Sequence, residues 1–155
     1  TSEDEAVTTD RVMAYLKELG YAPECERNDQ GVYWISIKYG DDTISMALDG
    51  PILQIVSLYG WGDMEQTHVN SYHFLHAANH TMRNIRFIQI TGNEHYCNFT
   101  INGYVFNMQM LRASLPQYLR TINESVLLNR QAFAAYTEEY EKHQQAENTN
   151  NQPVS

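Results

Sequence analysis

The strongest candidate for a chemically active site in this sequence is a group of three histidines. His73, His76 and His80 share one face of a predicted helix, because each residue of an α-helix turns by about 100°. Three imidazoles on one face could bind Zn²⁺ and leave a fourth position open. The cluster contains no carboxylate, and the sequence has no His-Glu-x-x-His pattern. We therefore favour a solvated polar face and expect no metal or other cofactor. A helix at an interface, whose charge changes near pH 6, is a further alternative.

The other candidate patterns have simpler structural explanations. The glycines of Gly60-Trp61-Gly62-Asp63 fit a tight connection between a strand and a helix, and a lone Gly-x-Gly does not build a dinucleotide site. The acidic pairs Asp41-Asp42 and Glu138-Glu139 fit a turn and an exposed helix, whereas acid–base catalysis needs carboxylates that converge in a cleft. Cys25 and Cys97 lie far apart, and the sequence has no Walker loop and no Gly-x-Ser-x-Gly elbow. We therefore expect no enzymatic activity.

Composition favours a protein as the partner. The chain of 155 residues has the size of one domain and a net charge of −9, which disfavours nucleic acid and anionic membranes. Basic protein segments are favoured instead, because opposite charges steer association. The 11 tyrosines suit strands as well as wet interfaces. Without a run of 18 apolar residues we expect no membrane span and a cytoplasmic location, although a start at Thr1 leaves open that a leader was removed.

Hydrophobic periodicity predicts the elements. A first helix carries an apolar stripe at Val12, Tyr15, Leu16 and Leu19, with Thr8 or Thr9 as its cap and Gly20 as its stop. Residues 22–27, 32–39, 43–48 and 52–59 then alternate as strands with short turns between them, which favours antiparallel pairing. A second helix is predicted from the capping box at Asp63 to about residue 83, followed by strands at 85–91 and 95–101 and a turn at Asn102-Gly103.

The last predicted element is a long helix from about Met108. Pro116 predicts a short turn before the main helix, because proline lacks the N–H that an interior position donates. The order is helix, three or four strands, helix, two strands, helix, which predicts an α+β domain with an antiparallel sheet and segregated helices. We place this single domain at 8–143 and expect flexible ends at 1–7 and 144–155.

A family resemblance rests on three segments. They are Leu19-Gly20-Tyr21, Ile52-Leu53-Gln54-Ile55-Val56, and Leu75-His76-Ala77-Ala78-Asn79 followed by Asn84-Ile85-Arg86-Phe87. With the order of elements over residues 8–140, they resemble the YbjN-like domains, also labelled sensory transduction regulators, which share the fold of type III secretion chaperones. The resemblance implies a non-enzymatic, often dimeric binding domain. The histidine-rich second helix and the polar end of the last helix depart from this pattern.

These observations lead to two hypotheses of function. The first is a chaperone-like or regulatory protein-binding module that acts as a homodimer and presents strand edges and sheet surface to a partner segment. Its candidate binding residues are the aromatic side chains that we expect to be exposed, namely Tyr33, Tyr39, Trp61, Tyr104 and Tyr118. The second is a metal- or small-molecule-dependent sensor or enzyme that uses His73, His76 and His80.

Overall fold

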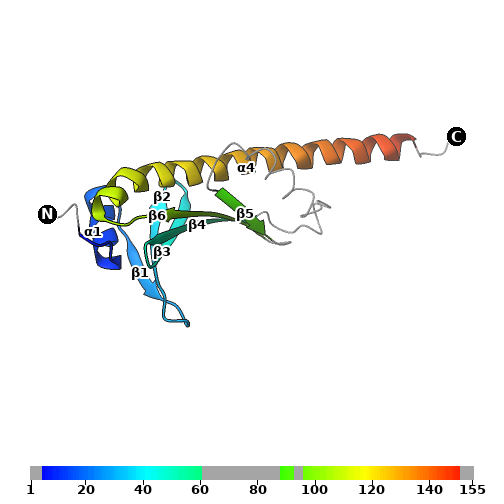
Figure 1. Cartoon of the computed structure of the whole chain (residues 1–155). Helices are drawn as coiled ribbons and strands as arrows, with labels where there is room; N and C mark the ends of the chain where they lie inside the picture. Colours follow the sequence, from blue (N-terminus) through cyan, green and yellow to red (C-terminus); the bar gives the residue numbers. More distant parts are fainter. Residues whose placement is uncertain (1–4, 61–87, 93–95, 151–155) are drawn as a thin grey trace.

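The computed structural model describes residues 5–60, 88–92 and 96–150. These residues form an α+β fold in which a six-stranded antiparallel sheet carries helices α1 and α4 on one face (Figure 1). The predicted α+β class with an antiparallel sheet is therefore confirmed. The predicted second helix lies outside the described residues.

The described elements follow the predicted order. Helix α1 (Thr9–Glu18) precedes strands β1 (Glu24–Arg27), β2 (Tyr33–Tyr39), β3 (Asp42–Asp49) and β4 (Ile52–Gly60), and β5 (Ile88–Gly92) and β6 (Tyr96–Tyr104) lead to α4 (Met108–Asn150). The strands lie in the order β1-β2-β3-β4-β6-β5, and every neighbouring pair is antiparallel. Strand β6 lies between β4 and β5, so the last described strand of the chain pairs with the final strand of the meander.

Helix α1 is delimited as its sequence predicts. The Thr8 hydroxyl accepts a hydrogen bond from the Arg11 N–H at 3.2 Å, which satisfies one free donor of the first turn. At the other end Gly20 has φ = 96°, and the Tyr21 N–H donates to the Leu16 carbonyl at 3.0 Å. This is a Schellman stop, which favours glycine because a side chain is strained at positive φ.

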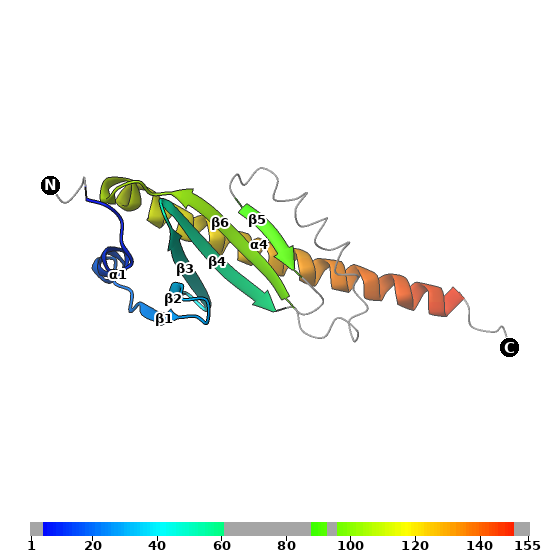
Figure 2. The same cartoon turned by 60° about the horizontal axis from the view of Figure 1, so that its bottom comes forward.

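Strand alternation places the core between the sheet and the two helices. Ile35 and Ile37 of β2 point toward the helices, and alternate positions of the neighbouring strands continue this face. The buried apolar strand side chains on this face are Ile35, Ile37, Ile44, Met46, Leu53, Ile55, Phe99 and Ile101. Those of the helices are Val12, Tyr15, Leu16, Met108, Leu111, Leu115, Leu119, Ile122 and Val126. Ala47 is also buried, but its pairing with Gln54 places it on the other face of the sheet. Figure 2 shows β4 and β6 in front, with α4 behind them.

The predicted break at Pro116 is wrong, because α4 runs without interruption from Met108 to Asn150. Proline cannot donate to the carbonyl four residues earlier, which belongs to Arg112. The Tyr15 hydroxyl of α1 donates to this carbonyl oxygen at 3.2 Å. The Tyr15 hydroxyl of α1 thus replaces the missing N–H donor for the Arg112 carbonyl, so α4 can continue through Pro116.

The predicted turn at Asn102-Gly103 is also wrong, because β6 continues through both residues to Tyr104. Gly103 is buried and lies beneath the Tyr118 ring of α4. A Cβ atom at this position would lie 2.5 Å from Tyr118 Cε2, closer than real Cβ atoms approach other atoms. The glycine is therefore explained by the close approach of helix and strand, and not by a turn.

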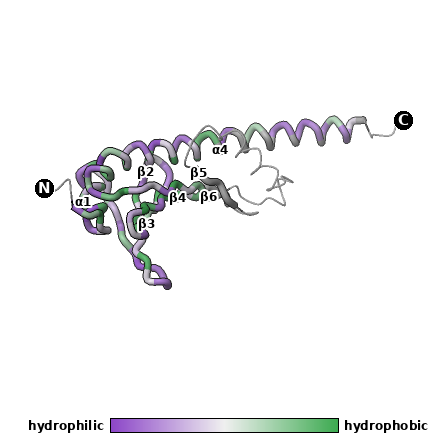
Figure 3. The backbone as a smooth tube through the Cα atoms, in the orientation of Figure 1, coloured by the Kyte–Doolittle hydropathy of each residue, from purple (hydrophilic) through white to green (hydrophobic). Residues whose placement is uncertain are grey.

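Parts of both predicted ends have defined contacts or helical structure. The Glu5 carbonyl accepts a hydrogen bond from the Met108 N–H at 3.0 Å, and Val7 packs against the core, so part of residues 1–7 is fixed. Helix α4 continues seven residues into the segment that we placed from 144 onward. The distal half of this helix extends beyond the sheet and is mostly hydrophilic (Figure 3).

Candidate functional site

Two aromatic rings are exposed where β6 leads into α4. Tyr104 and Phe106 are 56% and 60% exposed, and their ring centroids lie 5.4 Å apart with an interplanar angle of 14°. Val105 between them is buried, and its N–H donates to the Pro51 carbonyl at 2.7 Å. Extended backbone alternates its side chains, so this anchored valine turns both rings to the same side. The result is a stacked aromatic pair with solvent access.

The sheet register identifies the neighbours of this pair. Ile52 lies opposite Tyr104 on β4, and Asp49 lies opposite Ile52 on β3. The next outward-facing pair of β4 and β6 is Gln54 on β4 and Asn102 on β6. We call these six residues the Tyr104 surface, and they are Asp49, Ile52, Gln54, Asn102, Tyr104 and Phe106. The surface combines apolar rings, two amides and one exposed carboxylate, and the register places it on the sheet face opposite α4.

The chain around the Tyr104 surface is firmly held. Asn107 caps α4, because its Oδ1 accepts from the Met110 N–H at 2.8 Å and its carbonyl accepts from the Leu111 N–H at 3.1 Å. Gly103, on the other side of Tyr104, lies directly against Tyr118. The two rings therefore stand on backbone that is fixed from both sides, which lowers the entropy cost of binding.

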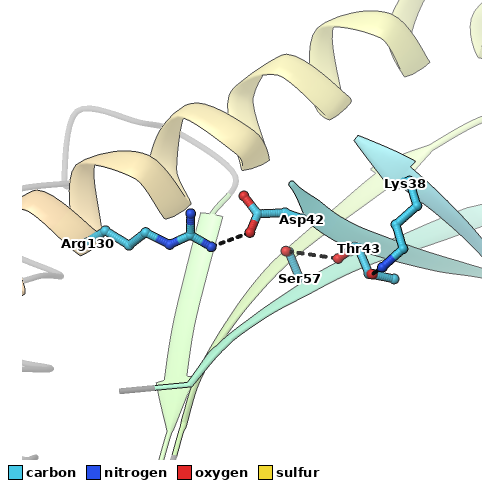
Figure 4. A network of polar contacts seen from close by, with 5 residues as sticks. All are labelled: Lys38, Asp42, Thr43, Ser57 and Arg130. Carbon is cyan, nitrogen blue, oxygen red and sulfur yellow. Dashed lines mark hydrogen bonds and ion pairs between the residues drawn. The ribbon is translucent and has the colours of Figure 1, made fainter. Parts of the chain in front are cut away.

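A second group of polar side chains joins β3 to α4 at the other end of the sheet (Figure 4). Arg130 of α4 forms an ion pair with the buried carboxylate of Asp42. Lys38 Nζ donates to Thr43 Oγ1 at 2.8 Å, and Ser57 Oγ donates to the Thr43 carbonyl at 3.1 Å. These contacts fix the β2–β3 turn and the middle of α4, so we assign them a structural role.

A shallow pocket of about 270 Å³ lies beside this network. It is lined by Asp41, Asp42, Thr43, Ser45, Val56 and Leu58. One of its two carboxylates, Asp42, binds Arg130, and the other, Asp41, is exposed. Two carboxylates of which one is neutralised do not form a catalytic pair. Within the described residues no group of three or more His, Cys, Asp or Glu could hold a metal ion.

The predicted aromatic residues lie in different environments. Tyr33 is 51% exposed, and the Arg27 guanidinium carbon lies 5.7 Å from its ring centroid. Tyr104 is exposed as predicted. Tyr39 and Tyr118 are half-buried and pack against the core, so we exclude them from the candidate surface.

Tyr39 has a structural partner in Tyr21, with the two ring centroids 6.0 Å apart. Burial raises the pKa of Tyr21 above its ordinary value, and Tyr39 adds to the effect. Trp61, His73, His76 and His80 lie outside the described residues.

Sequence reasoning did not name several exposed apolar residues, among them Phe106 and Leu58. Phe106 follows the Asn102-Gly103 pair that we took as the end of the strand, so the continuing alternation of Tyr104, Val105 and Phe106 was overlooked. Leu58 is 59% exposed on β4, in a segment that we predicted as a strand without naming an exposed residue in it. Alternation in β4 places Leu58 on the face away from α4, whereas Ser57 is buried.

Comparison with models of known protein families and with curated proteins finds no match. Across the part of the chain that the structure describes, no helix combines the length and apolar character that a membrane span requires.

Proposed function

We propose that this chain is a non-enzymatic protein-binding module that binds a segment of a partner protein at the Tyr104 surface. The observation that carries the proposal is the exposure of the stacked Tyr104 and Phe106 rings on backbone that is held from both sides. Two aromatic rings in solvent are unfavourable for a free domain and favourable for one whose partner covers them. Aromatic side chains are also enriched among the residues that dominate binding energy.

The chemistry of the surface supports a protein as the partner. The Gln54 and Asn102 amides can bind the backbone of an extended segment. A nucleic acid could stack on the rings, but its phosphates would be repelled by a protein of net charge −9. A protein segment fits both the apolar and the polar part of the surface.

We further propose that the module is chaperone-like and acts as a homodimer. The order of the described elements supports the first point, because it agrees with the element order on which the resemblance rests. Exposed apolar side chains on α4 support the second point, since Leu127 and Leu128 are 43% and 46% exposed. Sedimentation at micromolar concentration tests the dimer, and Leu127→Ser with Leu128→Ser should shift it toward monomer.

Peptide selection tests the binding function. A displayed library of random 12-residue peptides is selected on the protein, and enriched sequences are measured against two variants. We expect binding to be lost in Tyr104→Ser with Phe106→Ser and kept in Tyr33→Ser, which removes an equally exposed tyrosine elsewhere. Equal binding to both variants, or no enriched peptide at all, would refute the proposed function.

A further inference from the structure

We propose that the Tyr104 surface recognises an arginine side chain of the partner segment, with the guanidinium stacking on the Tyr104 ring, which Phe106 supports, and Asp49 pairing with its charge. This inference rests on the proposed function and specifies the chemistry of the partner. Arginine is favoured over lysine because its planar guanidinium stacks on aromatic rings and binds carboxylates through a fork of N–H donors.

The chain already contains this arrangement among its own surface contacts. Arg112 lies over the Tyr15 ring, with its guanidinium carbon 4.9 Å from the centroid, and its Nη1 lies 2.8 Å from Glu18 Oε2. One guanidinium therefore binds a tyrosine ring and a carboxylate at the same time. The Tyr104 surface presents the same two groups, a tyrosine ring and a carboxylate, on its exposed side.

The register places these two groups at a suitable separation. Tyr104 and Asp49 are both opposite Ile52, one on each side, so two strand spacings of roughly 10 Å in total separate their backbones. Because both side chains project from the same face, a guanidinium above Ile52 lies between ring and carboxylate. Ile52 is half-buried and supplies an apolar floor for the methylene groups of the arginine.

Charge supports a cationic occupant. The Asp49 side chain is exposed at the end of β3, and the chain carries a net charge of −9. Among the described residues, Arg27 lies over the Tyr33 ring and Arg112 lies over the Tyr15 ring. The Tyr104 ring instead stacks on the Phe106 ring. A positively charged segment would be attracted to this surface at long range and bound by it at short range.

Titration with small probes tests the inference directly. N-acetyl-arginine methylamide is added to the full chain and followed by NMR, with the citrulline analogue as an uncharged probe of the same shape and the lysine analogue as a cation without a planar group. We expect shifts at Asp49, Tyr104 and Phe106 with arginine, smaller shifts with lysine and none with citrulline. The affinity for arginine should fall with added salt.

Matched variants separate the roles of ring and carboxylate. Asp49→Asn should weaken arginine binding by up to about fivefold, as expected for an exposed ion pair, whereas Asp29→Asn, in the exposed turn before β2, should leave it unchanged. Equal shifts with arginine and citrulline, or arginine shifts centred elsewhere, would overturn the inference. In that case selected peptides that still depend on Tyr104 and Phe106 would leave the proposed function standing, so the two failures can be told apart.

Discussion

The hydroxyl of Tyr15 donates a hydrogen bond to the carbonyl oxygen of Arg112, the acceptor that Pro116 leaves without its helical donor. The same Arg112 places its guanidinium over the Tyr15 ring and pairs with Glu18. Helix α1 is thus joined to α4 at the turn where the backbone ladder of α4 is incomplete, and the two helices stabilise each other there.

A double-mutant cycle tests this relationship. Tyr15→Phe keeps the ring and removes the hydroxyl, so we expect a loss of about 1–2 kcal/mol in the free energy of unfolding, measured with urea. Pro116→Ala restores an N–H that can bond to Arg112, so the same Tyr15→Phe change should cost less in that background. An equal cost in both backgrounds would show that the hydroxyl and the proline are not coupled.

Gly103 should not tolerate a larger residue. In Gly103→Ala the new methyl group meets the Tyr118 ring, so we expect a destabilisation of about 1–3 kcal/mol in urea unfolding. Tyr118→Leu removes the clashing atoms, and the alanine should then cost much less. As a control, alanine at Gly20 has no neighbour within 4 Å, so its cost reflects positive φ alone and should persist beside Tyr118→Leu.

The ion pair of Asp42 and Arg130 should hold the middle of α4 to the sheet. Arg130→Met leaves a buried carboxylate without this partner, and because Arg130 itself is 38% exposed we expect a moderate loss of about 1–2 kcal/mol. Asp42→Asn in the same chain should recover part of the loss. Hydrogen exchange of the α4 amides near residue 130 should accelerate in the single variant, and unchanged exchange would contradict the role that we assign.

The pair of Glu18 and Arg112 should make stability depend on pH in the acid range. A hydrogen bond from Arg112 and the attraction of its charge hold the pKa of Glu18 below its ordinary value of 4.5. Because the folded pKa is lowered, this contribution is present above the ordinary value and is lost as the pH falls through the folded pKa. The difference in Tm between the wild type and Glu18→Gln should therefore shrink below about pH 4.5. A difference that is constant from pH 7 to 3 would contradict the pairing.

The elements that depend on local pattern were predictable from sequence. Alternation located β2, β3 and β4 within two residues, and the cap at Thr8 and the stop at Gly20 followed from the chemistry of helix ends. The errors at Pro116 and Gly103 share one cause. In both cases a tyrosine from a distant part of the chain, Tyr15 or Tyr118, changes what the local residue can do, and no local rule contains that contact.

The candidate surface was only half predictable for a similar reason. The amphipathic nature of tyrosine indicated Tyr104, but it indicated Tyr39 and Tyr118 equally, and burial of a ring depends on packing that a single sequence does not encode. Phe106 was missed because the strand was ended too early. Asp49 had the features of a turn residue, and its place beside the aromatic pair follows from the order of β3, β4 and β6 in the sheet.

The unbroken course of α4 has a practical consequence for binding measurements. Its 43 residues rise over a length of roughly 65 Å, and Phe106 lies two residues before its first turn. A tether attached at Asn150 would therefore hold the molecule to a sensor chip by the C-terminal end of α4. The Tyr104 and Phe106 rings, near the opposite end of this helix, would then face the solution. A tether near α1 would place the chip beside those rings and could hide them from a ligand.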